Sequence, residues 1–298
     1  MEKLARLADI LARHTHGDGA FDTPLAGVSL MRTSTPTMPM PVVYEPTLCL
    51  VAQGRKQAML GTTAYVYDAA NYLVASVDLP VMGSVIEASA DKPYLCLRLN
   101  LDMTALSDLA LRHPSDEKLP DDSPGLSVNR TTPELLDAAL RLAALLDTPA
   151  DIDALAPLFT REILYRLLTG PGNGVVHQMA RANSRLNAIA RAIVWLRAHY
   201  AQECRIDDMA DVAGMSRSTF HTHFKGVTSM SPLEFRTQLR MQEARRLMVA
   251  EGLDAASAGY RVGYESPSQF SRDYARLFGA PPARDASRLR SEAPAAAH

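Results

Sequence analysis

A pattern of two short helices joined by a glycine turn occurs twice in the last third of the chain, and no other feature constrains the fold as strongly. The first copy reads IDDMADVAGMSRSTFHTHFK from residue 206, and the second closes with VGYESPSQFSRDY from residue 262. In both copies a serine, Ser216 or Ser266, stands where a helix N-cap is expected, and two aromatic residues follow at a spacing of four. The sequence therefore predicts two helix-turn-helix units in one all-α module.

The aromatic pairs, Phe220 with Phe224 and Phe270 with Tyr274, are predicted to lie in the core, because residues four apart share one helix face. The opposite faces then expose small polar and basic side chains: Arg217, Ser218, His221 and Thr222 in the first copy, and Ser268, Gln269, Ser271 and Arg272 in the second. Short polar side chains let a helix approach base edges in the major groove of DNA. A long amphipathic helix over 231–249 separates the copies, so two recognition helices about 34 Å apart are expected to enter successive grooves.

The first half of the chain has a different texture. Residues 25 to 101 consist of short runs rich in Val, Leu and Tyr, separated by Pro, Gly, Asp or Asn, which is typical of an antiparallel sandwich or barrel. A short helix over 1–14 precedes this region. A Pro- and Asp-rich loop at 113–125 and a helical hairpin over 132–169 follow it, with Thr132 as N-cap and Gly170 at the end.

The charge is divided between the two halves. The whole chain has 31 Lys and Arg against 33 Asp and Glu, a net charge of −2. From Ser184 onward there are sixteen basic and twelve acidic residues, net +4, and the preceding part has net −6. Such asymmetry indicates that one half binds a polyanion. Three cysteines, no signal peptide and no apolar run of about 18 residues predict a cytoplasmic protein without a membrane partner.

The paired motif with its Ser-Pro linker helix resembles the DNA-binding domain of the AraC/XylS family of bacterial transcription regulators, over residues 187–290. The segment GYRVGYESPSQFSRDYARLFGAPP carries this resemblance most clearly. The segments MPVVYEPTLCLVAQGRKQAMLG and PYLCLRLNLD resemble the sensory domain of a YqhC-like branch of that family. The resemblance implies a cupin-like sensory β-barrel with dimerising helices, which controls DNA binding and contact with RNA polymerase.

The predicted fold class is therefore α+β, with an N-terminal cupin-like β-barrel that carries a helical hairpin and a C-terminal all-α domain with two helix-turn-helix units. The predicted domains are a sensory and dimerisation domain over 1–175, a linker over 176–183, a DNA-binding domain over 184–290 and a disordered tail over 291–298.

Carried over position by position, the family's base-facing residues fall on Ser218, His221 and Thr222 in the first unit, and on Ser268, Gln269 and Arg272 in the second. Arg217 joins them on the exposed face of its helix. This chain departs from the family pattern at Ala258 and Gly259, where Ile and Ala are common, and at Asp285, where an aromatic residue is frequent. These departures predict a less rigid second helix-turn-helix unit.

Two cysteines and an arginine in predicted strands form a candidate sensor: Cys49, Cys96 and Arg98. Alternate leucines fill one face of the strand over 94–101, so Cys96 and Arg98 share the other face. That face either meets solvent or lines a polar cavity. If it lines a cavity, Arg98 would hold an anionic effector, and Cys49 or Cys96 would report an electrophile or oxidant. Otherwise the cysteines are small buried hydrophobes.

These features predict a homodimeric regulator that binds double-stranded DNA and answers a small-molecule, electrophile or redox signal through its β-domain. Two alternatives stay open: a cupin-type small-molecule enzyme, and a dimeric regulator without an effector. His221 and His223 point to different sides of one helix, and the other histidines form no cupin-type ligand cluster. No metal, cofactor or catalytic residue is therefore expected, and the enzyme alternative lacks its metal ligands.

Overall fold

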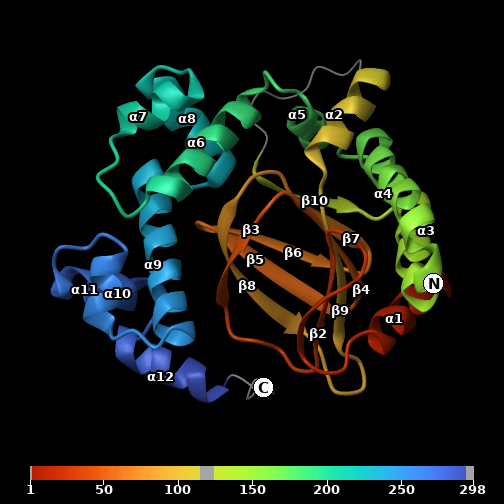
Figure 1. The fold of residues 1–298 in the computed structure, drawn as a ribbon, viewed down its shortest axis with the longest axis horizontal. Helices are drawn as coiled ribbons and strands as arrows, with labels where there is room; N and C mark the ends of the chain where they lie inside the picture. Colours follow the sequence, from red (N-terminus) through yellow and green to blue (C-terminus); the bar gives the residue numbers. More distant parts are fainter. Residues whose placement is uncertain (1, 115–123, 293–298) are drawn as a thin grey trace. The chain divides into compact units, whose positions relative to one another are not determined.

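The computed structural model describes residues 2–114 and 124–292. They fall into two compact units: a first unit of Met1–Ala190 with His223–Ser229, and a second unit of Arg191–Thr222 with Met230–His298. Among the described residues, all strands belong to the first unit, and the second unit is helical (Figure 1). Most of the predicted loop at 113–125 and of the predicted tail lies outside the described residues, and the predicted domain bounds stay a prediction.

The strands of the first unit form two antiparallel sheets. One is six-stranded, in the order β1 (Gly19–Asp22), β2 (Val28–Thr33), β9 (Tyr94–Asn100), β4 (Thr47–Gln53), β7 (Asn71–Ala75) and β10 (Leu126–Arg130). The other is four-stranded, in the order β3 (Met40–Tyr44), β8 (Leu79–Glu87), β5 (Arg55–Leu60) and β6 (Thr63–Asp68). The sheets face each other, since Lys56 on β5 reaches Met31 on β2. The predicted β-rich domain is confirmed as two facing sheets, whose pairing among the described strands does not close a barrel.

Alternation along β4 and β9 gives the six-stranded sheet one leucine-rich face. Its buried members are Leu48, Leu50, Leu95, Leu97 and Leu99. Helix α1 (Glu2–Arg13) packs against these two strands and buries Leu7 and Leu11 completely. Because successive side chains of a strand point to opposite faces, Cys49 and Cys96 lie on the other face, between the two sheets.

Helices α3 (Pro133–Ala144) and α4 (Ile152–Thr169) form the predicted hairpin and pack against each other. Thr132 is the N-cap of α3, and its side chain accepts a hydrogen bond from the Leu135 amide at 3.2 Å. Pro157 lies in the second turn of α4, because the helix begins at Ile152 after a 3-10 turn. At that depth the proline removes one intrahelical hydrogen bond.

Strands β1 and β10 and helices α2 (Met103–Arg112) and α5 (Gly174–Ala180) have no counterpart in the sequence-based expectations. Strand β10 pairs along its whole length with β7, and its mixed sequence LSVNR gives no clear alternation, so its pairing depends on the neighbouring strand. Helix α5 occupies most of the predicted linker and packs against α2. Its residues are buried, so this stretch is a packed part of the first unit.

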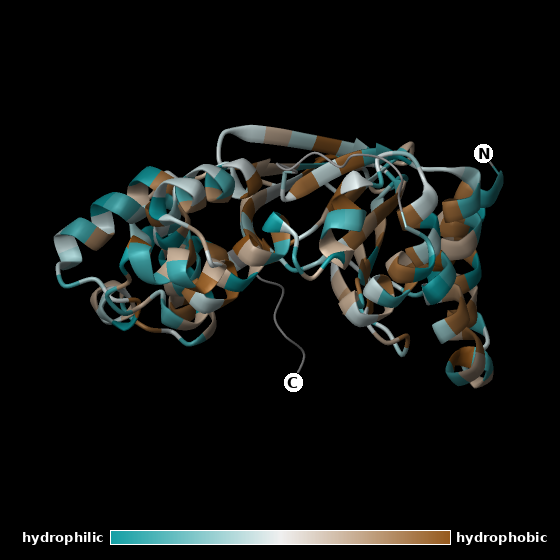
Figure 2. Cartoon of the chain, turned by 90° about the horizontal axis from the view of Figure 1, so that it is seen from above, coloured by the Kyte–Doolittle hydropathy of each residue, from teal (hydrophilic) through white to brown (hydrophobic). Residues whose placement is uncertain are grey.

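The helical part of the chain runs from α6 to α12 and contains both predicted helix-turn-helix units. Its elements are α6 (Arg185–His199), which begins in the first unit, α7 (Ile206–Ala213), α8 (Arg217–Thr228), α9 (Pro232–Ala250), α10 (Ala255–Arg261), α11 (Pro267–Phe278) and α12 (Pro282–Glu292). Figure 2 shows hydrophilic residues on the outer turns of these helices. Gly226 is expected to end a helix, but α8 continues through it to Thr228 and ends before Ser229, whose φ is 57°.

The two departures from the family pattern lie at packed positions of the second helix-turn-helix motif, and the predicted loss of rigidity stays a prediction. Gly259 lies against the Phe270 ring, and a Cβ built on it would come within 3.0 Å of the ring carbon Cγ. The glycine therefore lets α10 approach α11 more closely than alanine would, and Ala258 beside it is fully buried.

At position 285, where the family frequently has an aromatic residue, this chain has an aspartate that forms a buried ion pair. Its side chain has no exposed surface, and both of its carboxylate oxygens accept hydrogen bonds from Arg245 on α9, at 2.7 and 3.0 Å. Tyr274 on α11 and Arg288 on α12 donate to it as well. Burial by itself raises the pKa of Asp285, but these hydrogen bonds outweigh burial and hold its pKa below the ordinary value. Asp285 thus ties α9, α11 and α12 together.

We expect Asp285→Asn to destabilise the second unit by about 3 kcal/mol at neutral pH, because it leaves the buried Arg245 without its counter-charge. The single tryptophan, Trp195, lies in this unit, so urea unfolding followed by its fluorescence measures the change. Because the folded-state pKa of Asp285 is below the unfolded value of about 3.9, its contribution is full above that pH and is lost as the pH falls through the folded-state pKa.

The matched control is Arg246→Gln, which removes surface ion pairs with Glu243 and Glu251 and should change the free energy of unfolding by less than about 1 kcal/mol. Equal effects of the two substitutions would contradict this account of Asp285.

Candidate functional site

The exposed face of α8 carries the four residues that the sequence singles out in the first helix-turn-helix unit. Arg217, Ser218, His221 and Thr222 are all exposed, whereas Phe220 on the opposite face is fully buried. Two features set this orientation. Gly214 ends α7 in the left-handed conformation with φ 65°, and the Ser216 side chain accepts a hydrogen bond from the Thr219 amide at 3.4 Å.

The second helix-turn-helix motif repeats this arrangement on α11. Ser266 is the N-cap of α11 and Pro267 is its first residue. Phe270 and Tyr274 are fully buried, and the rings pack at a centroid distance of 5.6 Å. The three residues predicted on the other face, Ser268, Gln269 and Arg272, are all exposed. Both copies of the motif therefore present short polar and basic side chains outward.

A chain of hydrogen bonds links the polar side chains of α11, and sequence reasoning missed the residue at its centre. Asp273, whose side chain is only 13% exposed, accepts hydrogen bonds from the Gln269 side-chain amide at 3.1 Å, the Tyr264 hydroxyl at 3.1 Å and Arg276 at 2.9 Å. The carbonyl oxygen of Gln269 then accepts a hydrogen bond from Arg272 at 2.8 Å. Both ends of the Gln269 amide are thus occupied, and Arg272 keeps donors that are free to point outward.

Arginines of α9 attach the end of α6 to the long helix. Arg236 and Arg240 donate through Nε to the Tyr200 carbonyl, at 3.0 and 2.7 Å, and Arg240 also donates to the Ala201 carbonyl at 3.2 Å. Gly263 approaches the same Ala201 carbonyl so closely that a Cβ would collide with it. Because α9 lies between the two motifs in the chain, these contacts stiffen the spacer.

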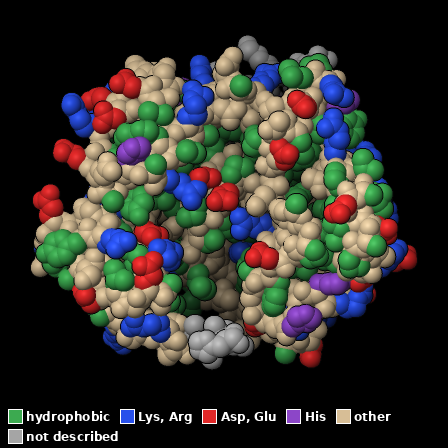
Figure 3. Space-filling model, in the orientation of Figure 1, with side chains coloured by type: hydrophobic (Ala, Val, Ile, Leu, Met, Phe, Trp, Pro, Cys, Tyr) green, Lys and Arg blue, Asp and Glu red, His purple; other side chains and the backbone are tan. Residues whose placement is uncertain are grey.

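Basic side chains do not gather in one uniform patch on the face shown in Figure 3, where Lys and Arg are interspersed with Asp and Glu. This agrees with the small basic excess after Ser184. Binding to a polyanion through this half would depend on individually placed contacts more than on bulk charge.

The interior of the first unit holds a second cluster of polar groups, and it contains the predicted residues Cys49 and Cys96. Strand register pairs Cys49 with Arg98 and Val51 with Cys96 across β4 and β9, so the two cysteines are diagonal neighbours on one face. Both cysteines are buried, at 4% and 2% exposure, and Arg98 is half-buried. The face over Cys49 and Cys96 therefore points into the domain and away from solvent.

Lys56 is the member of this cluster that sequence reasoning missed. It extends from β5 of the opposite sheet, is only 6% exposed, and its Nζ lies 3.6 Å from the Met31 sulfur and 5.7 Å from the centroid of the Tyr44 ring. The Tyr44 hydroxyl is 3.2 Å from the Tyr67 hydroxyl, and both tyrosines are buried. Strand alternation could have identified Lys56 as buried, because it lies on the same face of β5 as the buried residues Ala58 and Leu60.

The electrostatics of this cluster favour a thiolate at one cysteine. A hydrogen bond from Cys96 lowers the pKa of Cys49 to about 7, against the effect of burial and with help from the Lys56 charge. The same hydrogen bond and burial raise the pKa of Cys96. Burial lowers the pKa of Lys56, but Tyr44 and the two cysteines outweigh it, so the net pKa of Lys56 is raised and its ammonium persists. The interior thus holds a buried cation beside an acidic thiol.

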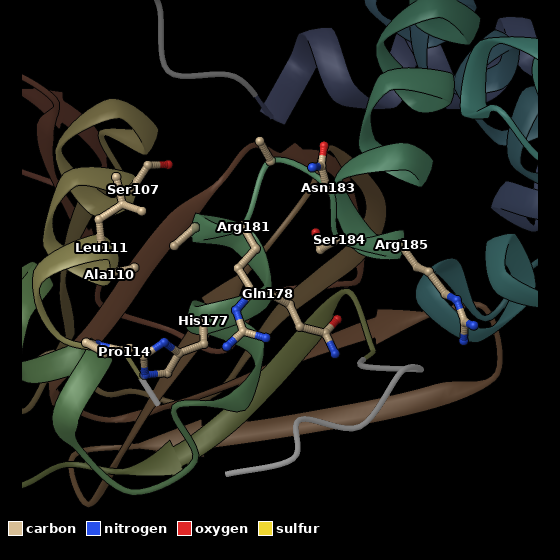
Figure 4. A pocket seen from close by; sticks show the side chains of 12 residues that line it. Ser107, Ala110, Leu111, Pro114, His177, Gln178, Arg181, Asn183, Ser184 and Arg185 are labelled. Atoms are coloured by element: carbon tan, nitrogen blue, oxygen red, sulfur yellow. The ribbon is translucent and has the colours of Figure 1, made fainter. Parts of the chain in front are cut away.

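A separate cavity of about 750 Å³ lies in the first unit beside α2 and α5. Figure 4 shows Arg181 and His177 lying close together in it, with Arg185 pointing away from them. His177 is buried, and its Nε2 lies 3.0 Å from the Leu168 carbonyl. This cavity offers a cationic side chain to a small anion, and no motif in the sequence indicates it.

Within the described ranges, no group of three or more His, Cys, Asp or Glu residues is arranged to hold a metal ion. His221 and His223 share α8 but are two residues apart, so they point to different sides of it. No described helix has the length and apolar character needed to cross a bilayer.

Comparison with known families and structures agrees with this arrangement. Residues 24–175 match the AraC-type transcriptional regulator N-terminus, and residues 209–288 match a helix-turn-helix domain. The transcriptional activator RhaS of Shigella dysenteriae serotype 1 (strain Sd197) is 26% identical over 220 residues, 73% of each chain. RhaS of Escherichia coli O1:K1 / APEC is 25% identical over 222 residues, again 73% of each chain.

Among solved structures, ToxT from Vibrio cholerae O395 bound to (E)-4-(8-methylnaphthalen-1-yl)but-3-enoic acid superposes with a TM-score of 0.58 at 11% identity, covering 88% of this chain and 98% of ToxT. Wild-type ToxT from strain SCE256 with a bound unsaturated fatty acid has a TM-score of 0.50 at 12% identity, covering 91% of this chain and 96% of ToxT. At these identities the likeness shows a shared fold.

Two helix-turn-helix motifs with polar, basic recognition faces, joined in one chain to a β-rich unit, define a DNA-binding transcription regulator. The chain belongs to the AraC-type transcriptional regulators. The relatives named above are regulators of transcription rather than enzymes. The narrower assignment to a YqhC-like branch stays a prediction.

Proposed function

We propose that α8 and α11 read DNA sequence, through the seven exposed residues Arg217, Ser218, His221, Thr222, Ser268, Gln269 and Arg272. The observation that carries the proposal is their shared exposure on the two faces opposite the buried aromatic pairs. Short side chains on α8 permit close approach to base edges, and the remaining Lys and Arg residues supply phosphate contacts. Such contacts make binding sensitive to salt.

The polar chain on α11 supports a specific role for Arg272 in this proposal. Because Asp273 and Arg272 bind the two ends of the Gln269 side-chain amide, Gln269 positions Arg272 and can contact a base only through the second N–H of its amide. Arg272 offers its outward donors to the base. Arginine donors match the two acceptors that guanine presents in the major groove. We therefore assign guanine recognition to Arg272 and a positioning role to Asp273.

A second part of the proposal concerns the signal. We infer that the interior of the first unit, with Cys49, Cys96, Arg98 and Lys56, receives a small effector that alters DNA binding. A buried ammonium and an acidic thiol between two sheets are costly to maintain, which supports a role beyond packing. ToxT, which shares the fold, binds carboxylic acids, and the cationic cavity beside α5 is a further candidate for an anion.

The regulator is proposed to act as a homodimer through the hairpin over 132–169 and to contact RNA polymerase when bound to DNA. Helices α3 and α4 pack together, and α4 leaves Leu158 60% exposed.

We expect His221→Ala and Arg272→Ala each to weaken binding to the specific operator by about 1–3 kcal/mol, because each removes a base contact. Binding to random DNA should change little. Titrations of labelled operator and of random duplex at one salt concentration measure both quantities. Equal losses on the two DNAs would show that these side chains touch only phosphates.

Asp273→Ala should relax the preference for guanine at one operator position by about tenfold, because Gln269 loses its acceptor and no longer holds Arg272 in place. Selection of binding sites from a randomised library measures this preference. Glu265→Gln is the matched control, because it removes one exposed negative charge next to α11 without touching the chain of hydrogen bonds. The positioning role is contradicted if both variants gain affinity equally and keep the guanine preference.

Cys49→Ser, Cys96→Ser and Arg98→Ala should each abolish or blunt the transcriptional response to the inducing signal, while the purified proteins still bind operator DNA. A promoter fusion in cells together with operator titration separates the two effects. Cys204→Ser is the control, because Cys204 lies in the second unit and donates to the His199 carbonyl. A full response in all three variants would remove the interior cluster from the signalling account.

A further inference from the structure

Three sulfur atoms come from three neighbouring strands on the inner face of the six-stranded sheet. Met31 of β2 is directly opposite Cys96 of β9, and Cys49 of β4 is the diagonal neighbour of Cys96 on the other side. The side chain of Cys49 interacts with that of Cys96, and Met31 is held by Lys56. Two buried thiols and a half-buried thioether thus share one face of the sheet.

The register of the strands argues against a disulfide as the purpose of this cluster. Diagonal neighbours across antiparallel strands have Cα atoms about 7–8 Å apart, whereas a disulfide requires no more than about 6.8 Å. Forming the bond would therefore require movement of β4 or β9, which are central strands of the sheet. An ion bound to both sulfurs at about 2.3 Å from each holds them as far as about 4.6 Å apart, which the diagonal pairing accommodates.

The ligand types and the charge select the kind of ion. Thiolate and thioether sulfurs are soft donors and prefer Cu(I) among the metals of the first transition row. Two thiolates with one monovalent ion carry a net charge of −1, and the buried ammonium of Lys56 balances it. A divalent ion would leave the buried ammonium without a counter-charge, which is costly in a dry interior.

We propose that Cys49, Cys96 and Met31 bind one soft monovalent metal ion of the Cu(I) class inside the first unit, with Lys56 as the counter-charge. One ion enters and forms two metal–thiolate bonds, Cys96 and the un-ionised fraction of Cys49 release their protons to solvent, and no oxidation state changes. The ion links β2, β9 and β4. Strands β9 and β4 also pack against α1. That this occupancy alters DNA binding rests on the proposed function above, whereas the metal site itself does not.

Titration of the reduced, full-length protein with Cu(I) under anaerobic conditions, in competition with a chromophoric Cu(I) chelator, tests the proposal. One equivalent should bind. Loss of a partner that contacts a metal ligand costs about 10–100-fold in metal affinity. Cys49→Ser and Cys96→Ser should each weaken Cu(I) binding by more than this. Lys56→Met should weaken it by an amount within this range. Cys204→Ser is the matched control and should bind as the unaltered protein does, because its sulfur lies in the second unit.

X-ray absorption of the copper-loaded, unaltered protein provides a measurement that needs no variant. Two or three sulfur neighbours and no nitrogen or oxygen neighbour are expected. Failure to compete with the chelator, unaltered affinity in Cys49→Ser or Cys96→Ser, or a nitrogen or oxygen shell would each overturn the proposal. Operator binding by the metal-free protein is measured on the same preparation. Operator binding without copper binding overturns only the metal site. Failure of the protein to bind the operator overturns the proposed function.

Discussion

The buried aromatic pairs of α8 and α11 fix everything that the DNA-binding half presents outward. Phe220 and Phe224, and likewise Phe270 and Tyr274, are fully buried. Because residues four apart lie on one side of a helix, burying each pair sets the rotation of its helix and leaves His221 or Arg272 on the exposed side. The caps and turns determine where each helix begins, and the aromatic pairs determine which face it offers to DNA.

Polar ties made by α9 then hold the parts of the helical module to one another. Arg245 is paired with Asp285 in the interior, and Arg236 and Arg240 hold the carbonyls at the end of α6. A buried ion pair contributes little net stability compared with an apolar contact, but its loss is expensive and its geometry is specific. The polar contacts of α9 therefore define how the helices of this module are arranged. An aromatic side chain at position 285 would contribute packing alone.

Most of the helical module could be predicted from sequence, because glycine, serine and proline mark its turns and caps at fixed distances from the aromatic pairs. The pairing of β10 with β7 could not, because LSVNR lacks alternation and depends on its neighbour. The ion pair of Asp285 could not be predicted either, because its partner Arg245 is forty residues away. Arg98 and the cysteines were recognised by strand phase, but Lys56 was missed because charged residues are presumed to face solvent.

The central claim is that one chain reads DNA sequence through two recognition helices. The most direct measurement is sequencing of the genomic DNA fragments retained by the purified full-length protein. The account predicts a shared motif of two short elements about 10 base pairs apart, one helical turn of DNA, with guanine prominent in one element. Retained fragments that share no motif, or only one uninterrupted element, would contradict it.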